Sequence, residues 1–290
     1  MEDRSVVYPL RALGRAAIRF SDKGGWVVSS HVAMSMMLAL FPFMLFIVAL
    51  ASVLTQQVDS SELIGLIMGT WPDDIAAPIE RELSAVMAAS KTGPLTLGAA
   101  LALYFASNGV DAIRVAMVRA YRDTDPRPFW KQRLVCLVFV IGGSAVVLMA
   151  AVLELFLPLY LHFVADAVPD GLRGWIAGDW AAKALTVALT VFAVFSFHMW
   201  LSGSRHTMAE VWPGVLLSFA LWWVMARAFG WYIAKFASYS ATYAGLAGAM
   251  AALIFLYLLA AILILGAEFN GVLARERRNR AEQPVKENEK

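Results

Sequence analysis

Charged residues and cysteine are both scarce in this chain. Of its 290 residues only 16% are Asp, Glu, Lys or Arg, against about 25% in an average soluble domain. The one cysteine, Cys136, excludes a disulfide within a single copy and any zinc or iron–sulfur site built on several cysteines. We also find no P-loop, dinucleotide-binding glycine motif, HExxH motif or nucleophile elbow. These absences argue against a soluble enzyme and against a disulfide-stabilised domain.

Long apolar runs fill most of the sequence, of which 60% is hydrophobic. A helix needs about 20 mostly apolar residues to cross the hydrocarbon core of a bilayer. The runs therefore predict an all-α, polytopic membrane protein with six transmembrane helices and a membrane domain over residues 26–273. The expected spans are 32–54, 95–118, 134–160, 183–201, 211–234 and 244–270.

The segments outside the spans have distinct characters. Residues 1–25 predict a basic amphipathic helix lying on the inner leaflet, and 274–290 predict a charged, disordered tail. The loop 55–93 predicts a pair of interfacial helices, either a lid over a cavity or a simple cover on the bundle. The first helix has an apolar face and an arginine stripe, formed by Leu10, Leu13, Ala17 and Phe20 and by Arg11, Arg15 and Arg19.

Lysine and arginine are concentrated in alternate loops, and this asymmetry predicts the orientation. The N-terminal segment, the loop after the second span and the tail are rich in basic residues, whereas the loop 55–93 holds only Arg81 and Lys91. We therefore expect a multi-pass protein of the bacterial inner membrane, with both termini in the cytoplasm and the loop 55–93 in the periplasm.

Several polar and ionisable residues interrupt the spans. A charge in the bilayer core is costly and needs a partner or water, and such residues often mark functional sites. From a rise of about 1.5 Å per residue, we expect one set to converge near the inner surface, with Asp111 and Arg114 close enough to pair. This predicted inner set comprises Asn108, Asp111, Arg114, His198, Glu268 and Asn270.

A second polar layer is expected nearer the outer surface, where Glu154 and Arg227 reach similar depth and are predicted to pair. Each layer has a functional interpretation, as part of a pathway or a headgroup site for membrane lipids, and a structural one, as charges that lock helices together or reach to the interface. No set of acids and histidines has the spacing of a metal site, so we expect no metal and no cofactor.

Small residues recur at four-residue spacing in the second and sixth spans. Gly98, Ala102 and Ala106 form one such face, and Gly245 and Ala249 belong to another. These faces permit close helix approach, either inside the bundle or between copies in a homo-oligomer.

Five motifs together resemble the YihY/BrkB family of bacterial inner-membrane proteins. They cover about residues 20–273 in the family's order. The motifs are SSHVAMSMMLALFPF, LYFASNGVDAIRVAMVRAYR, EVWPG, SATYAGLAG and LGAEFN. The resemblance implies a six-span inner-membrane fold. It does not imply one activity, because members have carried a ribonuclease label for tRNA processing and have been linked to serum resistance and to envelope lipids.

Three functions follow as hypotheses. We expect lipid or amphiphile transport or handling in envelope maintenance, with Arg114, Arg119 and Arg122 placed to attract an anionic headgroup. A non-transporting envelope scaffold or serum-resistance factor is the alternative. A tRNA-processing ribonuclease is the weakest hypothesis, because the cytoplasmic acids do not cluster as a two-metal site would. We therefore expect neither enzymatic activity nor a nucleic-acid partner.

Overall fold

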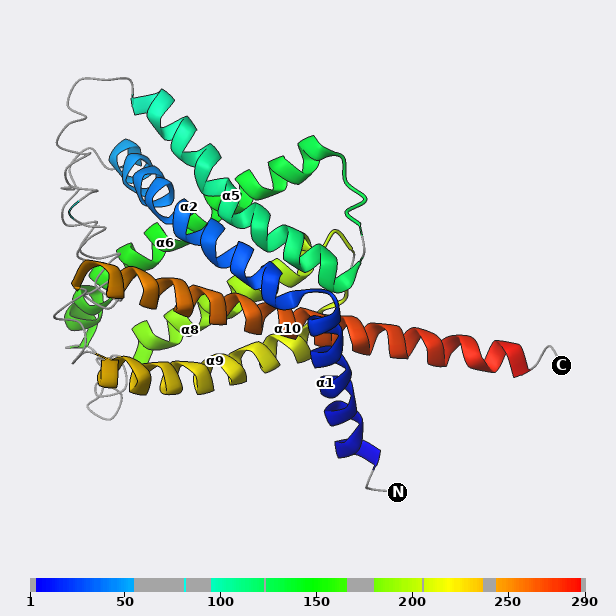
Figure 1. Cartoon of the computed structure of the whole chain (residues 1–290). Helices are drawn as coiled ribbons and strands as arrows, with labels where there is room; N and C mark the ends of the chain where they lie inside the picture. Colours follow the sequence, from blue (N-terminus) through cyan, green and yellow to red (C-terminus); the bar gives the residue numbers. More distant parts are fainter. Residues whose placement is uncertain are drawn as a thin grey trace. The chain divides into compact units, whose positions relative to one another are not determined.

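The computed structural model describes residues 4–54, 81, 95–122, 124–165, 180–204, 206–236 and 244–287. This described part is helical and contains no strand, which confirms the predicted all-α class. Its elements are α1 (Arg4–Asp22), α2 (Gly25–Leu54), α5 (Leu95–Tyr121), α6 (Phe129–Ala165), α8 (Trp180–Ser196), the π-helix η1 (Phe197–Leu201), α9 (Met208–Phe236) and α10 (Ala244–Glu287), all shown in Figure 1. The interfacial helices predicted for 55–93 fall outside the described residues, except for Arg81.

Five helices in the described part are long and apolar enough to cross a membrane. Their apolar segments are Gly25–Ile47, Gly98–Tyr121, Phe129–Ala150, Met208–Tyr232 and Gly248–Arg277. The predicted fourth span matches a shorter apolar helix, Thr186–Leu201. Together α8 and η1 extend for about 30 Å, close to the thickness of the hydrocarbon core. Membrane-spanning character is thus supported, whereas the division into six spans stays a prediction.

The C-terminal tail differs from the prediction of disorder. Helix α10 continues without a break through Arg277 to Glu287. Arginine, glutamate and alanine, which dominate this stretch, are strong helix formers, and Glu276 makes an ion pair with Arg15 of α1. Local propensity and this contact extend the helix beyond its apolar part.

Two compact units make up the chain. Unit 1 comprises residues 1–38, 109–133 and 194–290, and unit 2 comprises 39–108 and 134–193. In unit 2, Ile47 of α2 and Leu148 of α6 form a small buried cluster. Ala102 and Ala106 of the small-residue face are also buried in the single chain, which favours the use of this face within the chain.

In unit 1, α9 and α10 run side by side in opposite directions (Figure 1). Residues further along α9 contact residues earlier in α10. The Trp222 indole donates to the carbonyl of Leu259 (3.2 Å), and Phe229 lies against Phe255 with ring centroids 5.3 Å apart. Nearer the start of α9, the backbones approach closely at Gly214 and Gly266. This crossing is one that only glycines permit.

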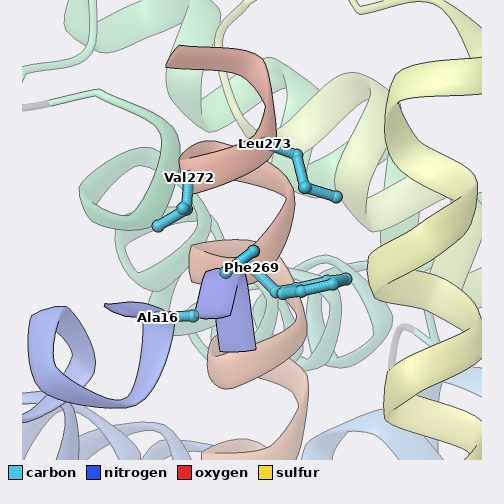
Figure 2. Packing of buried hydrophobic residues seen from close by; sticks show 5 residues of the cluster. Ala16, Phe269, Val272 and Leu273 are labelled. Atoms are coloured by element: carbon cyan, nitrogen blue, oxygen red, sulfur yellow. The ribbon is translucent and has the colours of Figure 1, made fainter. Parts of the chain in front are cut away.

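Helix α1 packs across α10 through small side chains. Figure 2 shows Ala16 of α1 beside Phe269, Val272 and Leu273 of α10, and Ala12 belongs to the same cluster. The amphipathic helix is confirmed, but its predicted apolar face is partly wrong: Ala17 is exposed, and the buried residues are Ala12, Ala16 and Phe20, with Leu13 packed beside them. Alanines allow two helices to approach closely, and this face of α1 packs against α10.

Candidate functional site

The structure places five of the six residues of the predicted inner set in unit 1. They are Asp111, Arg114, His198, Glu268 and Asn270. Arg114, His198, Glu268 and Asn270 are buried, and Asp111 is half-buried. Asn108 belongs to unit 2 and has an exposed side chain. The remaining five are distributed over three sets of contacts.

Asn270 is the centre of the first set, a hydrogen-bond network that joins α5, η1, α9 and α10. The backbone N–H of Gly214 donates to its Oδ1 (2.6 Å). Its Nδ2 donates to the carbonyl of Val211 (2.7 Å) and to the phenolic oxygen of Tyr121 (3.0 Å). The Tyr121 hydroxyl lies 2.7 Å from Nδ1 of His198. Because Asn270 is only 1% exposed, these bonds replace those that water would make.

The His198 ring belongs to the π-helical turn that ends α8. π-helical turns are rare and often occur at functional sites. The guanidinium of Arg127 donates to the last carbonyls of this turn, those of Trp200 (3.0 Å) and Leu201 (2.9 Å). Gly203 follows with φ of +70°, a conformation that favours glycine. The turn that carries His198 is thus fixed from outside by an arginine.

Ion pairs form the second set and connect α5 to that arginine. Arg114 donates to Asp111 (2.8 Å) and to Asp125 (2.6 Å), and Asp125 also accepts from Arg127 (2.9 Å). The predicted pairing of Asp111 with Arg114 is confirmed. The set runs from α5 through the loop after it to the π-helical turn.

Asp125 is the member of this set whose ionisation is most clearly perturbed. Burial by itself would raise the pKa of its carboxyl group. Hydrogen bonds from the side chain and backbone of Arg127 and from Arg114 outweigh burial, so the pKa of Asp125 lies below its usual value. Asp125 therefore stays ionised and holds both arginines at neutral pH.

Glu268 forms the third set with α1. Its buried carboxylate accepts from Nε of Arg19 (3.1 Å) and lies 3.8 Å from the ammonium group of Lys23. Arg19 and Arg15, which belong to the predicted arginine stripe, pair with acids of α10. These cations balance the charge of α10, which explains why a glutamate is tolerated inside an apolar helix.

The predicted outer pair is not established. The side chain of Glu154 lies outside the described residues. Arg227 is exposed on α9, with its guanidinium 5.8 Å from the ring of Trp223. Such a contact is a cation–π interaction, and the pairing of Arg227 with Glu154 stays a prediction.

Sequence reasoning missed Tyr121, Asp125, Arg127 and Arg19 as members of these sets. A signal existed for Tyr121, because it follows Arg114 by seven residues and therefore shares its helix face. Asp125 and Arg127 lie in a loop without periodicity, where only the closeness of opposite charges pointed to a pair. Within the described residues, no three His, Cys, Asp or Glu side chains gather closely enough to hold a metal ion.

Comparisons with known proteins agree with this architecture. A protein of Bacillus subtilis (strain 168), named ribonuclease-like protein YfkH, is 28% identical over 269 residues, which cover 92% of this chain and 96% of that protein. A UPF0761 membrane protein of Alkalilimnicola ehrlichii is 38% identical over 107 residues, which cover 36% of this chain and 22% of that protein. No solved structure matches. A family model described as virulence factor BrkB matches residues 16–290, so the chain belongs to the BrkB family of membrane proteins.

Proposed function

We propose that the chain is an inner-membrane protein, with both termini in the cytoplasm, that binds and moves lipids or other amphiphiles with anionic headgroups. Exposed cations and aromatic rings at the junction of α5 and α6 carry this proposal. Arg119, Arg122 and Lys131 are exposed there. Phe129 is 80% exposed and Trp130 is 61% exposed. Arginine, lysine and tryptophan are the residues that anchor helices at an anionic membrane surface.

The buried charges narrow the choice of headgroup-binding residues, because they already form ion pairs inside the protein. Arg114, which the sequence places where a headgroup could bind, donates to two carboxylates and is buried. It is better described as a residue that holds Asp111 and Asp125. Headgroup attraction therefore falls to the exposed side chains of the junction, Arg119 first among them.

The name of the Bacillus relative raises a ribonuclease as a second function. Two-metal nucleases need carboxylates whose oxygens are free to bind metal ions. Asp125 and Glu268 of unit 1 are instead bonded to Arg127 and Arg19. These ion pairs favour a structural role for the two acids.

A scaffold for envelope partners is the remaining alternative. It would use the exposed junction of α5 and α6 without moving a lipid.

Lipid binding by the purified full chain tests the proposal. We expect tighter binding to nanodiscs that contain an anionic lipid than to purely zwitterionic nanodiscs, measured by native mass spectrometry of the retained lipid. Each cation near an anionic surface contributes about 1 kcal/mol, or about a five-fold change in affinity. Arg119→Gln should lower anionic-lipid retention by about that factor. Arg119→Lys keeps the positive charge at the same position and serves as the matched control, with retention close to that of the wild type.

Two results would contradict the proposal. Equal retention of both lipid classes, unchanged by Arg119→Gln, would remove the headgroup site. Metal-dependent cleavage of a structured tRNA, lost in Asp125→Asn and retained through stringent purification, would favour the nuclease. A flux assay between leaflets then separates a lipid transporter from a scaffold that only binds lipid.

A further inference from the structure

The donors and acceptors around Asn270 fix the direction of each hydrogen bond in its network. Gly214 can only donate through its N–H, so the atom that it meets must be the amide oxygen of Asn270. The amide nitrogen then donates to the Val211 carbonyl and to the Tyr121 oxygen. The Tyr121 oxygen accepts this bond and keeps its own hydrogen for another, and Nδ1 of His198 lies 2.7 Å away.

The two polar neighbours of Nδ1 favour one tautomer of His198. The Asn270 amide nitrogen, 3.5 Å away, can only donate, and the Tyr121 hydroxyl, 2.7 Å away, has a hydrogen to donate. Nδ1 is therefore an acceptor, and the neutral imidazole carries its hydrogen on Nε2. His198 is 0% exposed, and its Nε2 is buried without a hydrogen-bond partner among the described residues.

The charges near the network indicate what kind of acceptor fits. Glu268 is balanced by Arg19 and Lys23, whereas Glu210 lies 4.0 Å from His206, whose ring lies against Tyr121. His198 is fully buried, and an anion beside it would have to give up its hydration in a low dielectric, so a neutral oxygen is favoured.

We propose that Nε2–H of His198 is the donor of a binding site for a neutral oxygen acceptor, either a water molecule or the ester carbonyl of a lipid. The π-helical turn is an independent observation in its favour, because such turns often present functional groups. The site does not depend on the proposed lipid function. A water molecule would occupy it whether or not the chain moves lipids.

Nitrogen-15 NMR of histidine-labelled full chain in nanodiscs at neutral pH tests this site. His198→Asn assigns the His198 signals by their loss. We expect a single neutral tautomer with hydrogen on Nε2, a downfield hydrogen-bonded proton, and magnetisation transfer from that proton to water or to a ¹³C-labelled lipid carbonyl. Nanodiscs of ether lipid, which lack ester carbonyls, distinguish the two sources, because only a water signal survives in them.

The Tyr121→Phe variant tests the direction of the bonds. Loss of the hydroxyl frees Nδ1 of His198, so we expect a second tautomer to appear. A tautomer with hydrogen on Nδ1 in the wild type would overturn the proposal. Transfer to a carbonyl or carboxylate of the protein itself, or an Nε2 proton without a hydrogen-bonded shift, would overturn it as well. The wild-type measurement decides the question even if the variant does not fold.

Discussion

At the scale of single residues, Asn270 does the most to connect unit 1. One buried amide satisfies the N–H of Gly214, the carbonyl of Val211 and the hydroxyl of Tyr121. Leaving a buried polar group without a partner costs about 1–3 kcal/mol. We expect Asn270→Ala to lower the free energy of unfolding by about 3 kcal/mol or more, measured by thermal unfolding in detergent.

Asn108 provides the matched control for that substitution. It is the same residue type on an apolar helix, but its side chain is exposed. Asn108→Ala should change the free energy of unfolding by no more than about 0.5 kcal/mol, as is usual for an exposed site. Equal losses in the two variants would contradict a special role for the Asn270 amide.

Asp125 predicts how stability depends on pH. Its pKa is lower in the folded chain than in the unfolded one, so folding is favoured by the ionised form. This contribution is complete above the unfolded pKa of about 3.9 and is lost as the pH falls through the lower folded pKa. We expect Asp125→Asn to lose about 3 kcal/mol at neutral pH and to show a flatter stability curve below about pH 4.

Asp111→Asn is the comparison for the pH experiment, because the Asp111 carboxylate is 37% exposed and Arg114 keeps its bond to Asp125. Its loss at neutral pH should be the smaller of the two. Equal losses of stability in the two variants would mean that burial of Asp125 does not explain its contribution to folding.

At the scale of elements, the crossing of α9 and α10 depends on two glycines. A Cβ at Gly214 would overlap the carbonyl oxygen of Gly266, and a Cβ at Gly266 would overlap Ser218. Overpacking of a close contact costs about 1–3 kcal/mol. We expect Gly214→Ala and Gly266→Ala each to lower the unfolding midpoint in detergent.

Gly230, also on α9, is the control because a Cβ there meets nothing within 4 Å. Gly230→Ala should be neutral or stabilising by about 0.5–1 kcal/mol, since alanine restricts the unfolded chain. If all three variants behaved alike, backbone entropy rather than helix contact would explain them.

At the scale of the whole molecule, the orientation is the main untested prediction. In a Cys136→Ser background, a membrane-impermeant thiol reagent applied to whole cells should modify Ser61→Cys. It should spare Glu282→Cys, at the end of α10. The expected pattern follows from the excess of lysine and arginine on one side of the spans. Labelling of only Glu282→Cys would show that the chain has the opposite orientation.

The sequence by itself determined the helical membrane class and the approximate helix positions. Apolar length alone decides whether a segment can cross a bilayer, and the expected segments all coincide with helices of the described part. The pairing of Asp111 with Arg114 was also predictable, because residues three apart share one face of a helix.

Only the tertiary structure decided the partners of the remaining buried groups. Glu268 meets Arg19 across most of the chain, and Asn270 meets Tyr121 from another helix. Helical periodicity gives the face on which a side chain lies, but it does not say which helix that face will meet. The close crossing at Gly214 and the alanine face of α1 decide which helices meet, because only helices whose backbones can approach closely bring their side chains together.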